Sequence, residues 1–170
     1  MKQSRQTRRK FIQIASLGGV ATLLLGVRSE AAATTDALLL SCMDYRLMDD
    51  IERYMSGRGL RDKYDHVILA GASLGAITPK YPAWNETFWE HLDVAINLHA
   101  IHKVIVMDHK DCGAYKVILG ADKVADAKME KDVHTVQLKE LKSQINKKHP
   151  KLEVELLLMS LDGKAETIAV

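Results

Sequence analysis

The sequence predicts an α/β fold in one domain, with a mainly parallel β-sheet flanked by helices. Short apolar runs typical of buried strands alternate with longer segments whose apolar residues recur at helical spacing. The chain has 170 residues, 47% of them apolar, which suits one globular domain rather than two. No internal repeat, linker or low-complexity segment interrupts this pattern.

The first predicted unit is a strand followed by a helix. Residues 37–41 form an uncharged apolar run, as expected of a buried parallel strand. The helix is predicted over residues 45–56, and Gly57 and Gly59 end it. Its apolar residues at helical spacing are Leu47, Met48, Ile51, Tyr54 and Met55.

A second strand is predicted over residues 65–70, and it leads into a glycine-containing loop over residues 71–75. Pro79 and Pro82 disfavour a helix immediately after this loop. The next helix is therefore predicted over residues 84–101. Its apolar stripe consists of Trp84, Phe88, Leu92, Ala95 and either Leu98 or His99.

The third strand is predicted over residues 103–107, and a turn at 111–114 and a short helix ending near Leu119 follow it. A longer helical pattern extends over about 122–148 and stops before Pro150. On this helix, His134 shares an apolar stripe, so packing is expected of it rather than metal ligation. The rest of that stripe is Leu138, Leu141 and Ile145.

The chain closes with a fourth predicted strand over residues 152–159. An edge strand over 164–170 is predicted to follow the turn at Asp162 and Gly163.

The first 33 residues have the composition of an export signal. The first ten hold five basic residues and no acidic one, residues 11–27 are almost wholly apolar, and Ala31 to Ala33 form an A-x-A site. The paired Arg8 and Arg9 before an apolar pair resemble the twin-arginine signal of bacteria. We expect cleavage after Ala33, export by the twin-arginine machinery and a periplasmic location. An uncleaved membrane anchor is the alternative, although the apolar run is short for a bilayer span.

The net charge of +2 combines two different parts of the chain. Residues 34–170 carry 18 basic and 21 acidic side chains, which gives these 137 residues a net charge of −3. Aromatic residues make up only 5% of the chain and are scattered, so they form no base-stacking platform. Nothing in the composition points to a nucleic acid or an anionic membrane as a partner.

Both cysteines of the chain lie just past the ends of predicted strands. Cys42 opens a Cys-Met-Asp-Tyr-Arg run after the first strand, and Cys112 closes a His-Lys-Asp-Cys run after the third. The carboxyl ends of strands form the binding crevice of open α/β sheets where the strand order reverses, so these two turns are expected to meet. The thiolates of Cys42 and Cys112, the imidazole of His109 and the carboxylate of Asp44 make a zinc ligand set.

Asp44 has two possible roles, which the sequence leaves open. It either takes the fourth zinc position or pairs with Arg46, whose guanidinium fork holds a carboxylate in one orientation. A fourth position left open for water would make the site catalytic rather than structural. The alternative for Cys42 and Cys112 is a disulfide, which fits an oxidising compartment but gives no reason for the nearby His109, Asp44 and Arg46.

These two runs together resemble the signature of the β-class carbonic anhydrases, in which Cys-x-Asp-x-Arg precedes His-x-x-Cys. Residues 42–46 and 109–113 match it position by position, and the order and placement of the elements extend the resemblance over about residues 38–162. The resemblance implies a β-carbonic-anhydrase-like fold and a Zn²⁺ cofactor. The residues it implies are the metal ligands Cys42, His109 and Cys112 and the catalytic pair Asp44 and Arg46.

The resemblance also implies a reaction, the reversible hydration of carbon dioxide to bicarbonate. Zinc lowers the pKa of its bound water to about 7, which supplies a hydroxide to attack the carbon. Asp44 would accept a hydrogen bond from that hydroxide, while Arg46 would keep Asp44 ionised and off the metal. If Arg46 released it, Asp44 would bind zinc and close the site. Such proteins are commonly homodimers or larger homo-oligomers with the active site near a subunit interface.

The sequence departs from this family in three places. Residues 69–73 read Leu-Ala-Gly-Ala-Ser where a loop of Asn-Ala-Gly-Asn type is usual, and Asp108 replaces the glycine that usually precedes the zinc histidine. The mature chain also has almost nothing before its first strand, where a helical arm is common. Two alternatives on the same scaffold therefore stay open: a zinc hydrolase of carbonyl sulfide or carbon disulfide, and a non-catalytic zinc or ligand-binding protein.

A hypothesis from another class rests on residues 71–75. Gly-Ala-Ser-Leu-Gly fits the G-x-S-x-G nucleophile elbow of serine hydrolases, with Ser73 as the nucleophile. That elbow requires a helix directly after the serine, and Pro79 and Pro82 leave room for barely one turn. A domain of 137 residues is also short for that fold.

Overall fold

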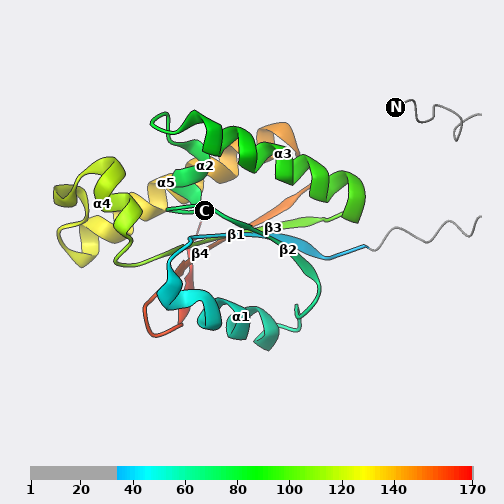
Figure 1. Cartoon of the computed structure of the whole chain (residues 1–170), viewed down its shortest axis with the longest axis horizontal. Helices are drawn as coiled ribbons and strands as arrows, with labels where there is room; N and C mark the ends of the chain where they lie inside the picture. The colour runs from blue at the N-terminus through cyan, green and yellow to red at the C-terminus, as the bar shows by residue number, and fades with distance from the viewer. Residues whose placement is uncertain (1–33, 170) are drawn as a thin grey trace, which may run out of the picture. The chain divides into compact units, whose positions relative to one another are not determined.

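The central feature of the fold is a five-stranded sheet with the strand order β2-β1-β3-β4-β5 (Figure 1). The computed structural model describes residues 34–169, so the export signal expected over residues 1–33 lies outside the described residues. β5 is antiparallel to β4, and the other neighbours are parallel. The strands are β1 (Ala37–Ser41), β2 (Tyr64–Ile68), β3 (Lys103–His109), β4 (Glu153–Met159) and β5 (Ala165–Thr167).

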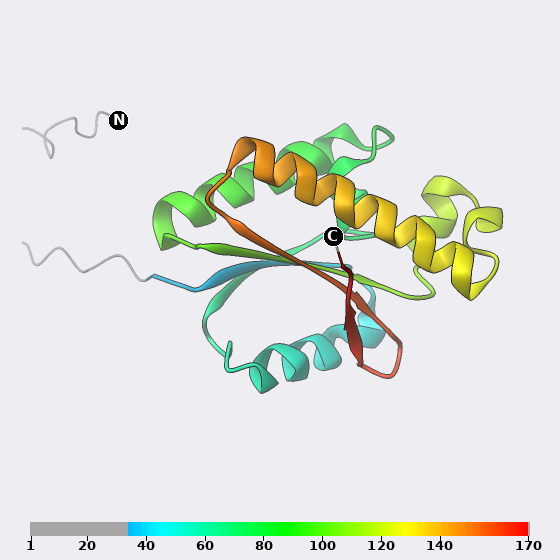
Figure 2. The same cartoon turned by 180° about the vertical axis from the view of Figure 1, so that it is seen from behind.

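Helices cover both faces of this sheet, which confirms the predicted fold class (Figures 1 and 2). α1 (Met48–Gly57) lies on one face, and α2 (Ser73–Ile77), α3 (Pro82–His99) and α5 (Ala127–Lys148) lie on the other. α4 (Gly113–Leu119) directly follows the loop at the carboxyl end of β3.

The two faces of the sheet form two separate hydrophobic cores. Leu38 of β1 packs in the core shared with α3 and α5, whereas its neighbour Leu39 packs in the core shared with α1. β3 alternates in the same way through Val104 and Ile105. Because side chains on both faces of the central strands are buried, β1 and most of β3 appear in the sequence as continuous apolar runs rather than as an alternation.

Several boundaries differ from the predicted ones for local reasons. The helix predicted over 45–56 begins with a 3-10 turn, η1 (Tyr45–Leu47), because the side chain of Asp44 caps it. The helix predicted over 122–148 is divided into η2 (Ala121–Val124) and α5, since the side chain of Asp126 caps α5.

The prolines also act differently from the expectation. α2 forms one turn before Pro79, although no helix was expected directly after the glycine-containing loop. α3 begins at Pro82 itself, because the first turn of a helix tolerates a residue without an N–H group.

The strand order reverses at β1, since β2 lies on one side of it and β3 on the other. This arrangement places the binding crevice expected of an open α/β sheet at the carboxyl ends of β1 and β3. Within residues 34–169, no helix is both long and apolar enough to span a membrane.

Candidate metal centre

The two predicted turns meet at the carboxyl ends of β1 and β3. Ser41 of β1 lies opposite Met107 of β3, so Cys42, directly after β1, lies close to His109 at the end of β3. Cys112 occupies the N-cap position of α4, three residues after His109. The three side chains are buried, and their ligand atoms all lie within 4.8 Å of one another. They form a Cys-His-Cys group that could hold a metal ion.

The spacing of the two sulfur atoms fits metal binding. Both cysteines are free, and the Sγ atoms of Cys42 and Cys112 lie 3.9 Å apart. Two thiolates at about 2.3 Å from one tetrahedral zinc ion would lie roughly 3.8 Å apart. A disulfide, the alternative for this pair, would require the two atoms to approach to about 2.05 Å.

His109 presents the nitrogen that a metal requires. Its Nδ1 lies 2.9 Å from the carbonyl oxygen of Lys110, which can only accept a hydrogen bond, so Nδ1 carries the proton. Nε2 is therefore left with its lone pair. That atom is buried and has no hydrogen-bond partner among the described residues. An orphaned basic nitrogen beside two thiols is the donor set that zinc prefers.

The surroundings of Cys42 favour a thiolate. The hydrogen bond from the Cys112 thiol is the main cause that lowers the pKa of Cys42, and the nearby His109 and the N–H of Gly71 lower it further, although burial opposes them. The same contact with Cys42, together with burial, raises the pKa of Cys112. The contact therefore favours one thiolate beside one thiol over two thiolates.

Asp44 and Arg46 pair with each other at the edge of this group. Arg46 donates from Nε to Asp44 Oδ1 at 2.9 Å and from Nη2 to Oδ2 at 2.7 Å. These bonds are the main reason that the pKa of Asp44 is lowered to about 2. Asp44 Oδ2 lies 3.8 Å from Nε2 of His109, although Asp44 is not part of the Cys-His-Cys group.

Asp111 is a residue near the site that the sequence reasoning missed. It accepts a hydrogen bond from Arg46 Nη1 at 2.9 Å, and its carbonyl oxygen accepts one from Nη2 at 3.1 Å. Its backbone is left-handed, with φ of 56°, and its N–H donates to Glu130 Oε1 at 2.6 Å. Asp111 therefore holds the side of Arg46 that Asp44 leaves free. The only signal in the sequence is its place between His109 and Cys112.

An apolar cavity of about 390 Å³ opens beside the two cysteines. Tyr81 and Trp84, which stack with ring centroids 4.1 Å apart at the start of α3, form part of its wall. The other lining residues are Cys42, Met43, Asp44, Tyr45, Ala70, Cys112, Gly113, Ala114, Val117 and Ile118.

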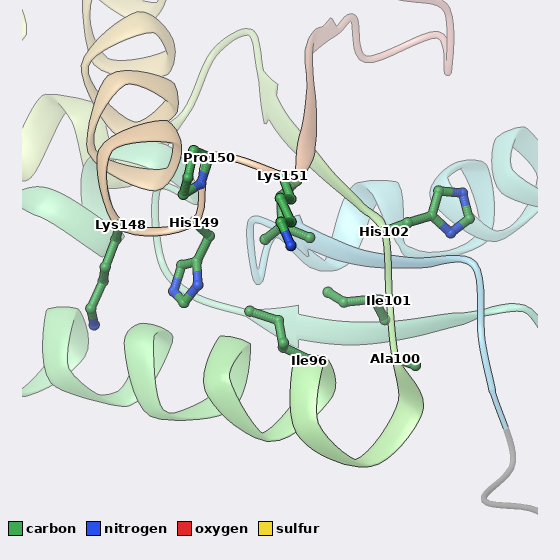
Figure 3. Close-up of a pocket in the computed structure, with 9 residues that line it drawn as sticks. Ile96, Ala100, Ile101, His102, Lys148, His149, Pro150 and Lys151 are labelled. Carbon is green, nitrogen blue, oxygen red and sulfur yellow. The ribbon is translucent and has the colours of Figure 1, made fainter.

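A second cavity, of about 500 Å³, lies at the opposite end of the sheet (Figure 3). Ile101 and His102 line it just before β3 begins, and Leu152 lines it just before β4 begins. Two of its basic residues, Lys148 and His149, face Asp93, at 4.0 and 3.3 Å. The cavity therefore shares no residue with the Cys-His-Cys group.

The geometry around Ser73 does not favour the nucleophile hypothesis. Ser73 is fully buried, and its hydroxyl donates to Asp108 Oδ2 at 2.7 Å. His134 is also buried, as expected, and its Nδ1 approaches the same oxygen at 2.9 Å. A hydrolase triad places the imidazole between serine and carboxylate, whereas here the carboxylate lies between the other two.

Fold and site together define an α/β protein with a buried Cys-His-Cys group at the switch point of its sheet. Residues 32–169 match the sequence profile of the family described as "Putative carbonic anhydrase". The match extends over most of the chain, and the chain belongs to this family.

Two similar sequences come from Rickettsia. An uncharacterized protein of Rickettsia bellii is 38% identical over 131 residues, which cover 77% of this chain and 80% of that protein. The uncharacterized protein RC0076 of Rickettsia conorii is also 38% identical over 131 residues, covering 77% of this chain and 70% of that one.

Solved structures of carbonic anhydrases share the fold. The carbonic anhydrase of Glaciozyma antarctica superimposes with a TM-score of 0.53 at 18% identity, covering 82% of this chain and 87% of that chain. The β-carbonic anhydrase CafD of Aspergillus fumigatus gives a TM-score of 0.55 at 11% identity, covering 79% and 90%. At these identities the likeness concerns the fold alone.

Proposed function

We propose that this protein is a zinc enzyme that catalyses the reversible hydration of carbon dioxide to bicarbonate. The observation that carries the proposal is the buried Cys42-His109-Cys112 group, with the Asp44–Arg46 pair at its edge and an apolar cavity beside it. Membership of the carbonic anhydrase family supports the same reaction.

Cys42, His109 and Cys112 would hold the zinc ion, through two sulfur atoms and Nε2. When bound, zinc would act as a Lewis acid that makes water ionise near neutral pH. Asp44 was the other candidate ligand. Because Arg46 engages both carboxylate oxygens of Asp44, we place Asp44 beside the metal rather than on it and leave the fourth position for water.

Asp44 would orient the attacking water. Its pKa of about 2 keeps the carboxylate ionised, so Oδ2 can accept a hydrogen bond from the water and fix the direction of an oxygen lone pair. Arg46 holds that carboxylate in one orientation, and Asp111 holds Arg46 from its other side. The reaction adds one water to carbon dioxide and releases bicarbonate and a proton.

The cavity suits a small apolar substrate. Its wall is built mainly from apolar and aromatic side chains, among them Met43, Trp84, Val117 and Ile118. Such a wall accommodates carbon dioxide, and it would equally accept carbonyl sulfide or carbon disulfide. These two molecules are therefore the alternative substrates of the same site.

Stopped-flow rates with carbon dioxide, carbonyl sulfide and carbon disulfide would test the proposal on the purified protein. We expect the highest kcat/KM with carbon dioxide and a loss of about 10–100-fold in Asp44→Asn. Glu155→Gln is the control, since it breaks a comparable ion pair with Arg58, at 2.8 Å, outside this site. Faster turnover of carbonyl sulfide or carbon disulfide would assign that reaction instead. If none of the three substrates were turned over, the proposal that the protein is an enzyme would be refuted.

We further propose that residues 1–33 are a twin-arginine signal and that the protein acts in the periplasm. The basic head, apolar stretch and A-x-A site support this assignment. Mass spectrometry of the protein from a periplasmic fraction should give a chain beginning at Thr34. A full-length chain in the membrane fraction would support the anchor alternative.

We also propose a homodimer or larger homo-oligomer. Met43, Tyr45 and Val117 are 64%, 85% and 67% exposed at the mouth of the cavity, and a second copy would cover them. Tetrameric β-carbonic anhydrases are known from Sordaria macrospora, and a chain of theirs shares the fold, at 10% identity and a TM-score of 0.52. Light scattering should give at least twice the mass of one chain, and a monomer at micromolar concentration would refute this.

A further inference from the structure

Four buried polar side chains form a connected network next to the metal centre. Ser73, Asp108, Tyr115 and His134 are each at most 1% exposed. Asp108 accepts hydrogen bonds from the N–H of Ser73 at 2.9 Å, from its hydroxyl at 2.7 Å and from the hydroxyl of Tyr115 at 2.6 Å. The Nδ1–H of His134 donates to the same carboxylate at 2.9 Å. None of the four residues has a part in the proposed reaction.

The network joins every segment that carries a proposed metal ligand. Asp108 directly precedes His109 on β3, and Tyr115 lies three residues after Cys112 on α4. Ser73 begins α2 two residues after Gly71, whose N–H donates to the Sγ of Cys42 at 3.3 Å.

The connection from Ser73 to Cys42 passes through a strained residue. Ala72 has φ of 39° and ψ of −102°, which is unfavourable for a residue with a Cβ atom. Such a conformation persists only when its surroundings fix it. Here the bonds from Ser73 to Asp108 fix one side of Ala72, and the bond from Gly71 to Cys42 lies on the other.

We propose that Asp108 is a positioning residue which, through Ser73, Tyr115 and His134, fixes the geometry of the Cys42-His109-Cys112 metal centre. Asp108 does not line the apolar cavity beside the cysteines and is not one of the three residues of that group. It acts by holding the Gly71 N–H against the Cys42 sulfur and by tying α4 and α5 to the end of β3. The inference rests on the proposed function only in requiring that this group binds a metal.

Cobalt(II) binding to the full protein provides a test that does not depend on activity. Thiolate-to-cobalt charge-transfer bands and d–d bands report the ligand geometry, and titration gives the metal affinity. Ser73→Ala and Tyr115→Phe each remove one donor to Asp108 with little change of shape. We expect both variants to shift these bands and to lower the cobalt affinity by roughly tenfold. Asp108→Asn should lose more affinity, and all three losses should lie within the 10–100-fold typical of residues that orient metal ligands.

Thr78→Val is the matched control, because Thr78 is also buried and lies at the other end of α2. Among residues 34–169, its Oγ1 accepts a hydrogen bond from the N–H of Lys80 and none from the network. It should leave the cobalt spectrum unchanged. If Asp108→Asn does not fold, the two milder variants decide the matter, with near-UV circular dichroism to confirm that they are folded.

The outcomes separate the two proposals. Folded Ser73→Ala and Tyr115→Phe proteins with the spectrum and affinity of Thr78→Val would overturn the positioning role. A wild type that binds cobalt but hydrates no carbon dioxide would overturn the proposed reaction and leave the positioning role standing. A wild type that takes up no cobalt would overturn both.

Discussion

Gly75 offers a prediction in which the structure sets both the direction and the size of the effect. It lies in α2, where a Cβ atom would come within 2.5 Å of the carbonyl oxygen of Ala70 and 3.3 Å of the Cβ of Leu69. Ordinary van der Waals contact begins at 3.4 Å, so in Gly75→Ala the backbone at Ala70 must move by most of an ångström. Gly71 directly follows Ala70 in the chain, and its N–H donates to the sulfur of Cys42.

The cost of this movement can be estimated from the behaviour of overpacked cores. Gly75→Ala should lower the free energy of unfolding by about 1–3 kcal/mol. A domain of this size loses roughly 3–5 °C in melting temperature for each kcal/mol. Because the Gly71 N–H moves with Ala70, the metal affinity should fall as well, by about tenfold.

Urea unfolding at neutral pH and cobalt titration would measure both effects. Gly57→Ala is the control: nothing lies within 4 Å of the added Cβ, and Gly57 is the last residue of α1. Because alanine is a better helix former than glycine, this control should be neutral or stabilised by up to about 1 kcal/mol. Equal urea midpoints and equal cobalt affinities in the two variants would refute the reasoning.

Two further predictions concern the residues around Asp44. Arg46→Gln should slow carbon dioxide hydration by about 10–100-fold, because it frees Asp44 to turn toward the metal. It should also raise the pKa of Asp44 from about 2 toward 3.8. A carboxylate with a lowered pKa in the folded state stabilises the fold above about pH 4 and loses this contribution as the pH falls toward 2. The urea midpoint should therefore drop less between about pH 5 and pH 2.5 in Arg46→Gln than in the wild type. Equal pH profiles of the two proteins would contradict this. Asp111→Asn keeps the contact between the backbone carbonyl and Arg46, and asparagine tolerates a φ of 56°, so kcat should fall less than tenfold. A loss equal to that of Arg46→Gln would show that the side chain, not the carbonyl, holds Arg46.

The sequence predicted the centre of the sheet well because β1 and most of β3 are apolar on both faces. The run 37–41 is a strand with the predicted bounds, and the turns after β1 and β3 meet where the strand order reverses. The Cys-His-Cys group could be predicted because three residues of metal-binding types lie at or just after the ends of two strands. Family membership supports a carbonic-anhydrase-like protein, and the similar structures share its fold.

The contacts between distant residues could not be predicted in the same way. Asp111 accepts hydrogen bonds from Arg46 through both its side chain and its carbonyl oxygen, and its residue type does not reveal the left-handed backbone that it adopts. Asp108 stood out in the sequence as a departure from the family, Ser73 as a possible nucleophile and His134 as a packed residue. Nothing in their spacing shows that the carboxylate of Asp108 accepts hydrogen bonds from both Ser73 and His134, since α2 and α5 meet only in the folded chain.

The protein's own metal content, measured together with carbon dioxide hydration, tests the central claim most directly. We predict about one zinc ion per chain and hydration activity in the wild type, with both lost in Cys112→Ser. Purified protein without stoichiometric zinc, in which Cys42 and Cys112 are linked by a disulfide, would contradict the account.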